Sequence, residues 1–176
     1  MIKMKTKNKQ IIEHFNQQRI AVIGDLILDK YIYGKVDRIS PEAPIPIVNV
    51  IRQQYAAGGA ANVAANIATL SGQAFLFGIV GNDGYKDILI DSLNELNIDS
   101  AGILADSTRQ TIRKTRIIGM NQQLLRIDYE DSGYIAAQQE NEFIEIINGI
   151  SDLAAIIISD YAKGTITKKL VSQLIK

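Results

Sequence analysis

Aspartate residues follow three short apolar stretches of the sequence. Asp25 ends the stretch RIAVIGD, Asp83 ends AFLFGIVGND and Asp160 ends LAAIIISD. An ionised carboxylate accepts hydrogen bonds from several donors, so Asp25 and the nearby Asp29 would suit a ligand with many hydroxyl groups. The alternative is that these aspartates cap turns of the backbone, which is a common role for this residue type.

A Gly-Gly pair opens the alanine-rich stretch GGAANVAANIATL, which is predicted to form a helix over residues 60–71. Gly58 and Gly59 have no Cβ atom, so a ligand could approach the backbone there. The start of the helix would offer free N–H groups, and the Asn62 side chain can both donate and accept hydrogen bonds. A tight strand-to-helix turn would explain the glycines equally well, and the stretch has neither a Walker A nor a GxGxxG pattern.

Several cations lie in residues 110–131, whose alternating pattern predicts a two-stranded hairpin. Because successive residues of a strand face opposite sides, Lys114 and Arg116 should share a face and Arg113 should take the other. Such cations suit a ligand with a phosphate group. Lys163, in SDYAKG, could also reach a phosphate. The alternative is an edge strand protected by solvated charge.

The composition excludes several classes of protein. The chain has 176 residues and is 47% hydrophobic, which indicates one folded domain rather than a disordered chain. Its 19 basic and 19 acidic residues cancel, so no strong field favours nucleic acid or an anionic membrane. There is no cysteine, and the one histidine, His14, lies in a polar segment. We therefore expect no disulfide, no metal site of thiolates or histidines, and no histidine-based triad.

Residues 1–18 are predicted to form a polar leader with a short helix around residues 11–15. The leader has four lysines in its first ten residues but no apolar segment after them, so it does not resemble a signal peptide. The longest apolar run covers residues 153–158, whereas a membrane span needs about 20 such residues. Together with the absence of cysteine, this pattern fits a cytoplasmic protein.

Alternating strands and helices would position these side chains. Buried strands are predicted at 19–25, 74–83 and 153–164, a further strand at 101–106, and helices at 60–71, 85–96, 136–148 and from 165 onward. This order predicts an α/β fold with a mainly parallel sheet, in which ligands bind beyond the carboxyl ends of the strands. Residues 39–51 contain all three prolines and become strand-like only from Ile45, which favours an edge strand or a projecting hairpin.

Four stretches together resemble the heptose 7-phosphate kinases, a branch of the ribokinase (PfkB) superfamily of sugar kinases. They are RIAVIGDLILDKYIYGKVDRISPEAPIPIV, GGAANVAANIATLSG, TRIIGMNQQLLRID and ISDYAKG. The Gly-Gly-x-x-Asn element is general to the superfamily, whereas RISPEAP and NQQLLRID are more specific to the heptose branch. The resemblance covers about residues 19–176.

The resemblance implies a three-layer α/β/α sandwich, incomplete in this chain, with a small β-lid over the sugar site. The lid would comprise about residues 31–51 and 110–128 and would offer a surface for a homodimer. The implied reaction transfers the γ-phosphoryl group of ATP, with Mg²⁺, to the anomeric hydroxyl of D-glycero-β-D-manno-heptose 7-phosphate. Its product feeds the synthesis of ADP-heptose and of the lipopolysaccharide core.

The resemblance also implies roles for individual residues. Contacts to sugar hydroxyls are expected from Asp25, Gly58, Gly59 and Asn62. Contacts to the sugar phosphate or within the lid are expected from Lys114, Gln123, Arg126 and Lys163. Further candidates are Asp29, Arg38, Arg116 and Asp160.

The sequence departs from the superfamily in one respect. It contains neither the Asp-Thr-x-Gly-Ala-Gly-Asp signature, whose last Asp activates the acceptor hydroxyl, nor the metal-linked Asn-x-x-Glu motif. Phosphoryl transfer depends on positioning, Mg²⁺ and charge stabilisation. We therefore expect no catalytic residue of this reaction in the chain, no kinase activity from the chain alone, and an uncovered sheet edge. The alternatives are a non-catalytic sugar-phosphate-binding or assembly module, and a kinase of the superfamily that acts on another sugar.

Overall fold

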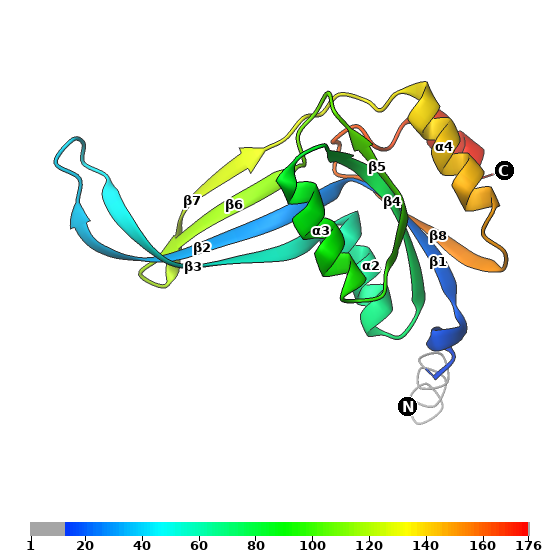
Figure 1. Cartoon of the computed structure of the whole chain (residues 1–176), viewed down its shortest axis with the longest axis horizontal. Helices are drawn as coiled ribbons and strands as arrows, with labels where there is room; N and C mark the ends of the chain where they lie inside the picture. The colour runs from blue at the N-terminus through cyan, green and yellow to red at the C-terminus, as the bar shows by residue number, and fades with distance from the viewer. Residues whose placement is uncertain (1–12, 176) are drawn as a thin grey trace, which may run out of the picture.

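The computed structural model describes residues 13–175 (Figure 1). Most of the predicted leader lies outside the described residues, as do residues 11 and 12 of the helix expected around residues 11–15. The described part begins with a short 3-10 helix, η1 (Phe15–Gln17), which leads into the first strand. Among the described residues, no helix is both long enough and apolar enough to cross a membrane.

A parallel four-stranded sheet, here called the core sheet, forms the centre of the molecule. Its strands in spatial order are β5 (Asp99–Asp106), β4 (Gln73–Gly81), β1 (Arg19–Gly24) and β8 (Leu153–Ser159). Each neighbouring pair runs parallel. Continuous apolar runs form β1 and β4 because both faces of these central strands are covered. The predicted α/β fold with a parallel sheet is confirmed.

Helices cover both faces of the core sheet. They are α2 (Ala60–Thr69), α3 (Gly84–Asn94), α4 (Ala137–Asn148) and α5 (Lys168–Leu174). Successive side chains of β1 point to opposite faces of the core sheet, so the hydrophobic core has two parts. Val22 packs with α2 and α3, whereas Ala21 and Ile23 pack with α4 and α5. On the second side, the rings of Phe77 and Phe143 meet edge to face at 6.2 Å. The three layers of the expected α/β/α sandwich are present.

A second four-stranded sheet, here called the lid sheet, projects from one side of the core (Figure 1). Its strands in spatial order are β3 (Pro46–Gly59), β2 (Leu26–Ile39), β6 (Arg113–Gly119) and β7 (Gln122–Tyr129). Strands β6 and β7 form the hairpin predicted at residues 110–131, here called the lid hairpin, with a turn at Met120 and Asn121 whose φ angles are 52° and 60°. The lid sheet thus joins two segments that are far apart in the sequence.

Two predictions for the strands differ from the structure. Strand β3 does not end near Ile51 but continues to Gly59, because it pairs with β2 along its whole length. Strand β8 is not buried, since Ile157 and Ile158 are 36% and 38% exposed. Within the described residues β8 pairs only with β1, so its outer side is a free edge even though its apolar composition suits burial. The expected uncovered sheet edge is therefore present.

Candidate functional site

A cavity of about 490 Å³ lies where the lid sheet leaves the core. Four strands (β2, β3, β6 and β7), the start of α2 and the loop after β8 contribute to its wall. The residues that line it are Ile27, Asp29, Tyr31, Ala56, Ala57, Gly58, Gly59, Asn62, Lys114, Arg116, Arg126 and Tyr161. Seven of these are residues that the sequence nominates: Asp29, Gly58, Gly59, Asn62, Lys114, Arg116 and Arg126.

The two glycines at the start of α2 form part of the cavity wall. Gly59 has a φ of +58°, which side chains rarely tolerate, and a Cβ atom on it would lie 2.2 Å from the backbone oxygen of Asp25. A Cβ atom on Gly58 would lie 2.7 Å from Oδ2 of Asp29. The glycines therefore serve the tight strand-to-helix turn and also leave room for Asp29 at the cavity. The tight-turn interpretation is therefore confirmed, and contact between these glycines and a ligand stays a prediction.

Parallel pairing of β2 with β6 brings charged side chains to the cavity. The register places Asp29 beside Lys114 and Tyr31 beside Arg116. Arg116 donates a hydrogen bond from Nη1 to Oδ1 of Asp29, and this bond is the main reason why the pKa of Arg116 is raised. One carboxylate and two cations thus share one face of the lid sheet.

Arg113 takes the opposite face, as its position on the strand predicts. Its guanidinium lies between the rings of Tyr85 and Tyr129, 3.7 and 3.8 Å from their centroids, and only 8% of the residue is exposed. Tyr85 belongs to α3 and Tyr129 to β7. The two cation–π contacts therefore hold the base of the lid hairpin against the core.

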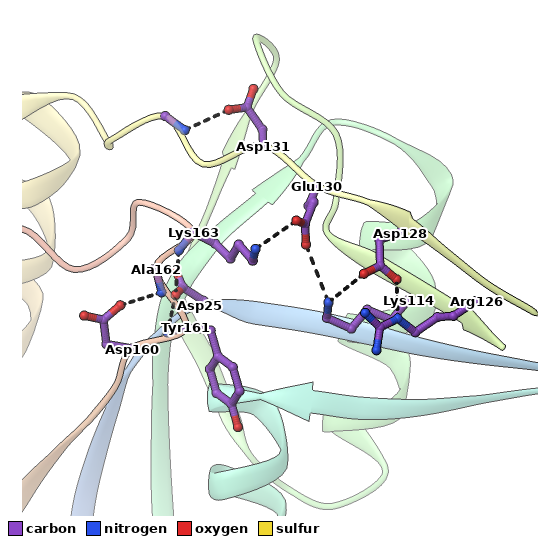
Figure 2. Close-up of polar contacts among 11 residues, drawn as sticks. Asp25, Lys114, Arg126, Asp128, Glu130, Asp131, Asp160, Tyr161, Ala162 and Lys163 are labelled. Atoms are coloured by element: carbon purple, nitrogen blue, oxygen red, sulfur yellow. Dashed lines mark hydrogen bonds and ion pairs between the residues drawn. The ribbon is translucent and has the colours of Figure 1, made fainter.

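A line of ion pairs joins the lid hairpin to the loop after β8 (Figure 2). Lys163 lies 2.9 Å from one oxygen of Glu130, and Lys114 lies 3.5 Å from the other. Lys114 also lies 3.2 Å from Asp128, which accepts a hydrogen bond of 2.9 Å from Arg126. We call these five side chains the ion-pair chain. Cations and carboxylates alternate along it.

The surroundings of both carboxylates in the ion-pair chain lower their pKa values. Partial burial would raise the pKa of Asp128, but hydrogen bonds from Lys114 and Arg126 outweigh this effect. The hydrogen bond from Lys163 is the main cause of the lowered pKa of Glu130, and burial opposes it. Both groups are therefore ionised at neutral pH.

Asp25 lies behind the cavity rather than on its wall. Its carboxylate is fully buried and accepts hydrogen bonds from the backbone N–H groups of Tyr161, Lys163 and Thr165, at 2.7, 3.1 and 3.1 Å. These bonds hold the loop after β8 in place, so that Tyr161 lines the cavity. In this structure Asp25 shapes the site through the loop, and the carboxylate on the cavity wall is that of Asp29.

The other two strand-end aspartates stabilise loops. Asp83 caps α3 by accepting hydrogen bonds from Tyr85 and Lys86, and it also binds the backbone and hydroxyl of Thr111. Burial would raise the pKa of Asp83, but these hydrogen bonds lower it. Asp160 is exposed and accepts a hydrogen bond of 2.8 Å from the N–H of Ala162. The capping alternative considered for such aspartates describes both.

Three candidates from the sequence lie off the cavity wall on the lid or beside it. Arg38 pairs with Ile47 near the far end of the lid sheet, and Gln123 is exposed on β7. Lys163 belongs to the ion-pair chain, with its ammonium beside Glu130. The structure therefore separates the candidates into a cavity group and a peripheral group.

Sequence reasoning missed four side chains at or beside the site: Tyr31, Asp128, Glu130 and Tyr161. Tyr31 stands two positions after Asp29, so recognition of β2 as a strand would have placed both on one face. Glu130 looks like ordinary surface charge in the sequence. Its position between two lysines arises only from the fold.

Comparison with known proteins places the chain among sugar kinases. The pfkB family of carbohydrate kinases matches residues 17–175. Proteins named bifunctional protein HldE are 42% identical over 165 residues in Magnetococcus marinus, and 39% identical over 174 residues in Geobacter sulfurreducens. These matches cover 92% and 98% of this chain but only 34% and 36% of the relatives. The chain thus spans about a third of the length of the curated relatives that it matches.

Solved structures support the same fold. Phosphofructokinase-2 from Escherichia coli, in a tetrameric inhibited form, is 19% identical and superposes with a TM-score of 0.66 over 90% of this chain and 50% of that one. Ribokinase from Arabidopsis thaliana, solved with ribose and ATP, is 14% identical and has a TM-score of 0.58 over 80% of this chain and 45% of that one. At these identities the likeness shows the fold. Sequence and fold together show that the chain belongs to the pfkB family of carbohydrate kinases.

Proposed function

We propose that this chain provides the sugar-binding part of a kinase that phosphorylates D-glycero-β-D-manno-heptose 7-phosphate at its anomeric hydroxyl with ATP. The reaction would serve the synthesis of ADP-heptose and lipopolysaccharide in the cytoplasm, where ATP is available. The similarity to HldE proteins and the heptose-branch stretches RISPEAP and NQQLLRID support this substrate.

The observation on which the proposal rests is the division of the cavity wall. One side offers the bare backbone of Gly58 and Gly59 with the amide of Asn62, which suits hydroxyl groups. The other side offers Lys114 and two arginines on the lid sheet, which suit a phosphate. A sugar phosphate presents both kinds of group at once.

The described residues do not fit the Mg²⁺ that the reaction needs. Among residues 13–175 there is no group of three or more carboxylates or histidines that could hold a metal ion. Asp29 is the one carboxylate on the cavity wall, and it already pairs with Arg116. We therefore assign no step of phosphoryl transfer to this chain. Binding and orientation of the sugar phosphate are the functions that its residues support.

Thermal-shift titrations with heptose 7-phosphate and, separately, with ATP test the proposal. A ligand at 100 times its Kd should stabilise the folded chain by about 2.7 kcal/mol. We expect stabilisation by the sugar phosphate and none by ATP. No response to the sugar phosphate would contradict the proposal. A coupled ADP-release assay with both substrates should show no turnover, and turnover would show that residues of this chain carry out phosphoryl transfer.

A sugar-phosphate-binding or assembly module is the second candidate, and the free edge of β8 favours it. An exposed strand edge with Ile157 and Ile158 beside it is suited to pairing with another polypeptide. The lid sheet offers a further surface for a homodimer, since Ile39 and Ile51 on it are 61% and 63% exposed. Sedimentation analysis of the chain and of Ile51→Lys would test the dimer. A dimer that the substitution does not weaken would exclude this face.

A further inference from the structure

Glu130 lies between two lysines that come from different parts of the molecule. Lys114 belongs to the lid hairpin, and Lys163 belongs to the loop after β8 that Asp25 holds in place (Figure 2). Each oxygen of the Glu130 carboxylate faces a different ammonium group, at 3.5 and 2.9 Å. The lysine side chains are only 19% and 20% exposed. Glu130 therefore bridges the lid hairpin and the core.

The bridging arrangement is one that a phosphate group could also adopt. Carboxylate and phosphate oxygens accept the same charge-assisted hydrogen bonds from lysine and arginine. A phosphate monoester has a charge of about −1.5 to −2 at pH 7 and three acceptor oxygens, so it attracts two ammonium groups more strongly than a carboxylate does. Lys114 lines the cavity in which the sugar phosphate is proposed to bind. Glu130 thus occupies a position that suits a ligand phosphate.

Charge balance around the cavity supports competition between Glu130 and a ligand. The four cations Lys114, Arg116, Arg126 and Lys163 all have carboxylate partners, namely Asp29, Asp128 and Glu130. An incoming anion therefore gains most if it replaces one of these carboxylates. Asp128 binds two cations of its own hairpin, whereas Glu130 lies beyond the end of β7 and is 34% exposed. Glu130 is the carboxylate that can leave with the least change to the sheet.

We propose that Glu130 is an internal counter-ion that holds Lys114 and Lys163 in place of a ligand phosphate and is displaced when that phosphate binds. This inference rests on the proposed function, because it assumes that the cavity takes a phosphorylated sugar. Displacement releases the lid hairpin from the loop after β8 as the ligand enters. It also makes the site selective, since a ligand must have enough negative charge to replace a carboxylate.

The test compares Glu130→Gln with Asp131→Asn in titrations with inorganic phosphate, in which calorimetry measures the binding. Asp131 is a matched control because it is adjacent, has the same charge, and accepts a hydrogen bond from the N–H of Gly133 rather than from a cation (Figure 2). We expect Glu130→Gln to bind phosphate about two- to fivefold more tightly than the natural chain, the range expected for one partly exposed ion pair. Asp131→Asn should change the Kd by less than that. Unchanged or weaker binding by Glu130→Gln would overturn the proposal.

Two further measurements separate this inference from the proposed function. Glu130→Asp withdraws the carboxylate by one methylene and should also tighten phosphate binding, which provides a second variant if Glu130→Gln does not fold.

Heptose 7-phosphate is titrated in parallel. If phosphate binds more tightly to the variants but heptose 7-phosphate does not bind, the proposed substrate is wrong and the counter-ion role stands. If heptose 7-phosphate binds with the same Kd to all proteins, the counter-ion role is wrong. If no protein binds phosphate, it is likewise overturned.

Discussion

The core sheet and the lid sheet are both four-stranded, but different forces stabilise them. The core sheet is parallel, and Ala21, Val22 and Ile23 on its central strand are 0% exposed. The lid sheet exposes large apolar residues such as Ile51, and ion pairs link its strands. Burial of a large apolar side chain is worth about 1.5–3 kcal/mol, whereas an exposed ion pair is worth about 0–1 kcal/mol. Stability should therefore depend mainly on the core, and ligand affinity on the lid.

The cavity lies at the junction of the two sheets and takes different groups from each. The turn into α2, which packs against the core sheet, supplies the fixed backbone at Gly59. The lid hairpin supplies Lys114 and Arg126, whose long side chains can move with the ligand. A rigid surface for hydroxyl groups thus faces an adaptable surface for charge. Four substitutions test this division, in order of their expected effect on stability.

The largest effect is expected for Phe143→Ala in the core. Phe143 is fully buried between α4 and the core sheet and contacts Phe77 edge to face. Removal of its ring should lower the free energy of unfolding by about 3–5 kcal/mol. Leu125→Ala on the lid is the control, because Leu125 is 53% exposed. Urea denaturation measures both, and equal losses would refute the division between core and lid.

Gly59→Ala should have the next largest effect. The positive φ of Gly59 and the 2.2 Å approach of a Cβ atom to the Asp25 oxygen both oppose a side chain there. Backbone strain of this kind costs about 1–3 kcal/mol, and sugar-phosphate binding should fall with it because the cavity wall shifts. Gly84→Ala is a matched control, since a Cβ atom on Gly84 meets nothing within 4 Å. A melting temperature for Gly59→Ala equal to that of the control would contradict this account.

A smaller, pH-dependent effect is expected at Asp106, at the end of β5. Hydrogen bonds from Thr108, aided by Gln139, lower the pKa of Asp106 from 3.8 to about 2. A carboxyl group whose pKa is lower in the folded state stabilises the fold above its unfolded pKa and loses this effect as the pH falls through its folded pKa. About 1–2 kcal/mol, after allowance for solvent screening, should be lost between about pH 4 and pH 2.

Asp106→Asn should remove that part of the acid dependence. Asp91→Asn, at an exposed position of α3, is the control and should leave the acid limb of the stability curve in place. Urea denaturation at successive pH values provides the measurement. The prediction is wrong if the two variants lose stability in parallel as the pH falls.

Lys114→Gln should have the smallest effect on stability and a clear effect on binding. Its two ion pairs are partly exposed, so their loss should cost less than about 1 kcal/mol. Loss of a charge-assisted contact to phosphate, worth about 1.5–3 kcal/mol, should weaken heptose 7-phosphate binding by roughly tenfold or more. Lys35→Gln, at an exposed position of β2 away from the cavity, should change neither quantity. Equal affinities of the two variants would remove Lys114 from the phosphate side of the site.

The comparison between sheets also explains which features could be predicted from the sequence. The helix expected at residues 60–71 is observed as Ala60–Thr69, and the hairpin expected at 110–131 is observed as β6 and β7. These elements depend on local periodicity and on turn residues. The burial of β8 was predicted wrongly, because apolar composition describes what a strand can bury and not which neighbours it has.

The amino-acid sequence is sufficient to predict the alternation of strands and helices, the glycine turn at Gly58 and Gly59, and the shared face of Lys114 and Arg116. Each of these follows from residue type and spacing along a few positions of the chain. The pairing of distant strands, by contrast, places Asp29 rather than Asp25 on the cavity wall and Glu130 between two lysines. These contacts could not be predicted because side-chain partners depend on which distant strands pair and in which register, and no local pattern contains that information.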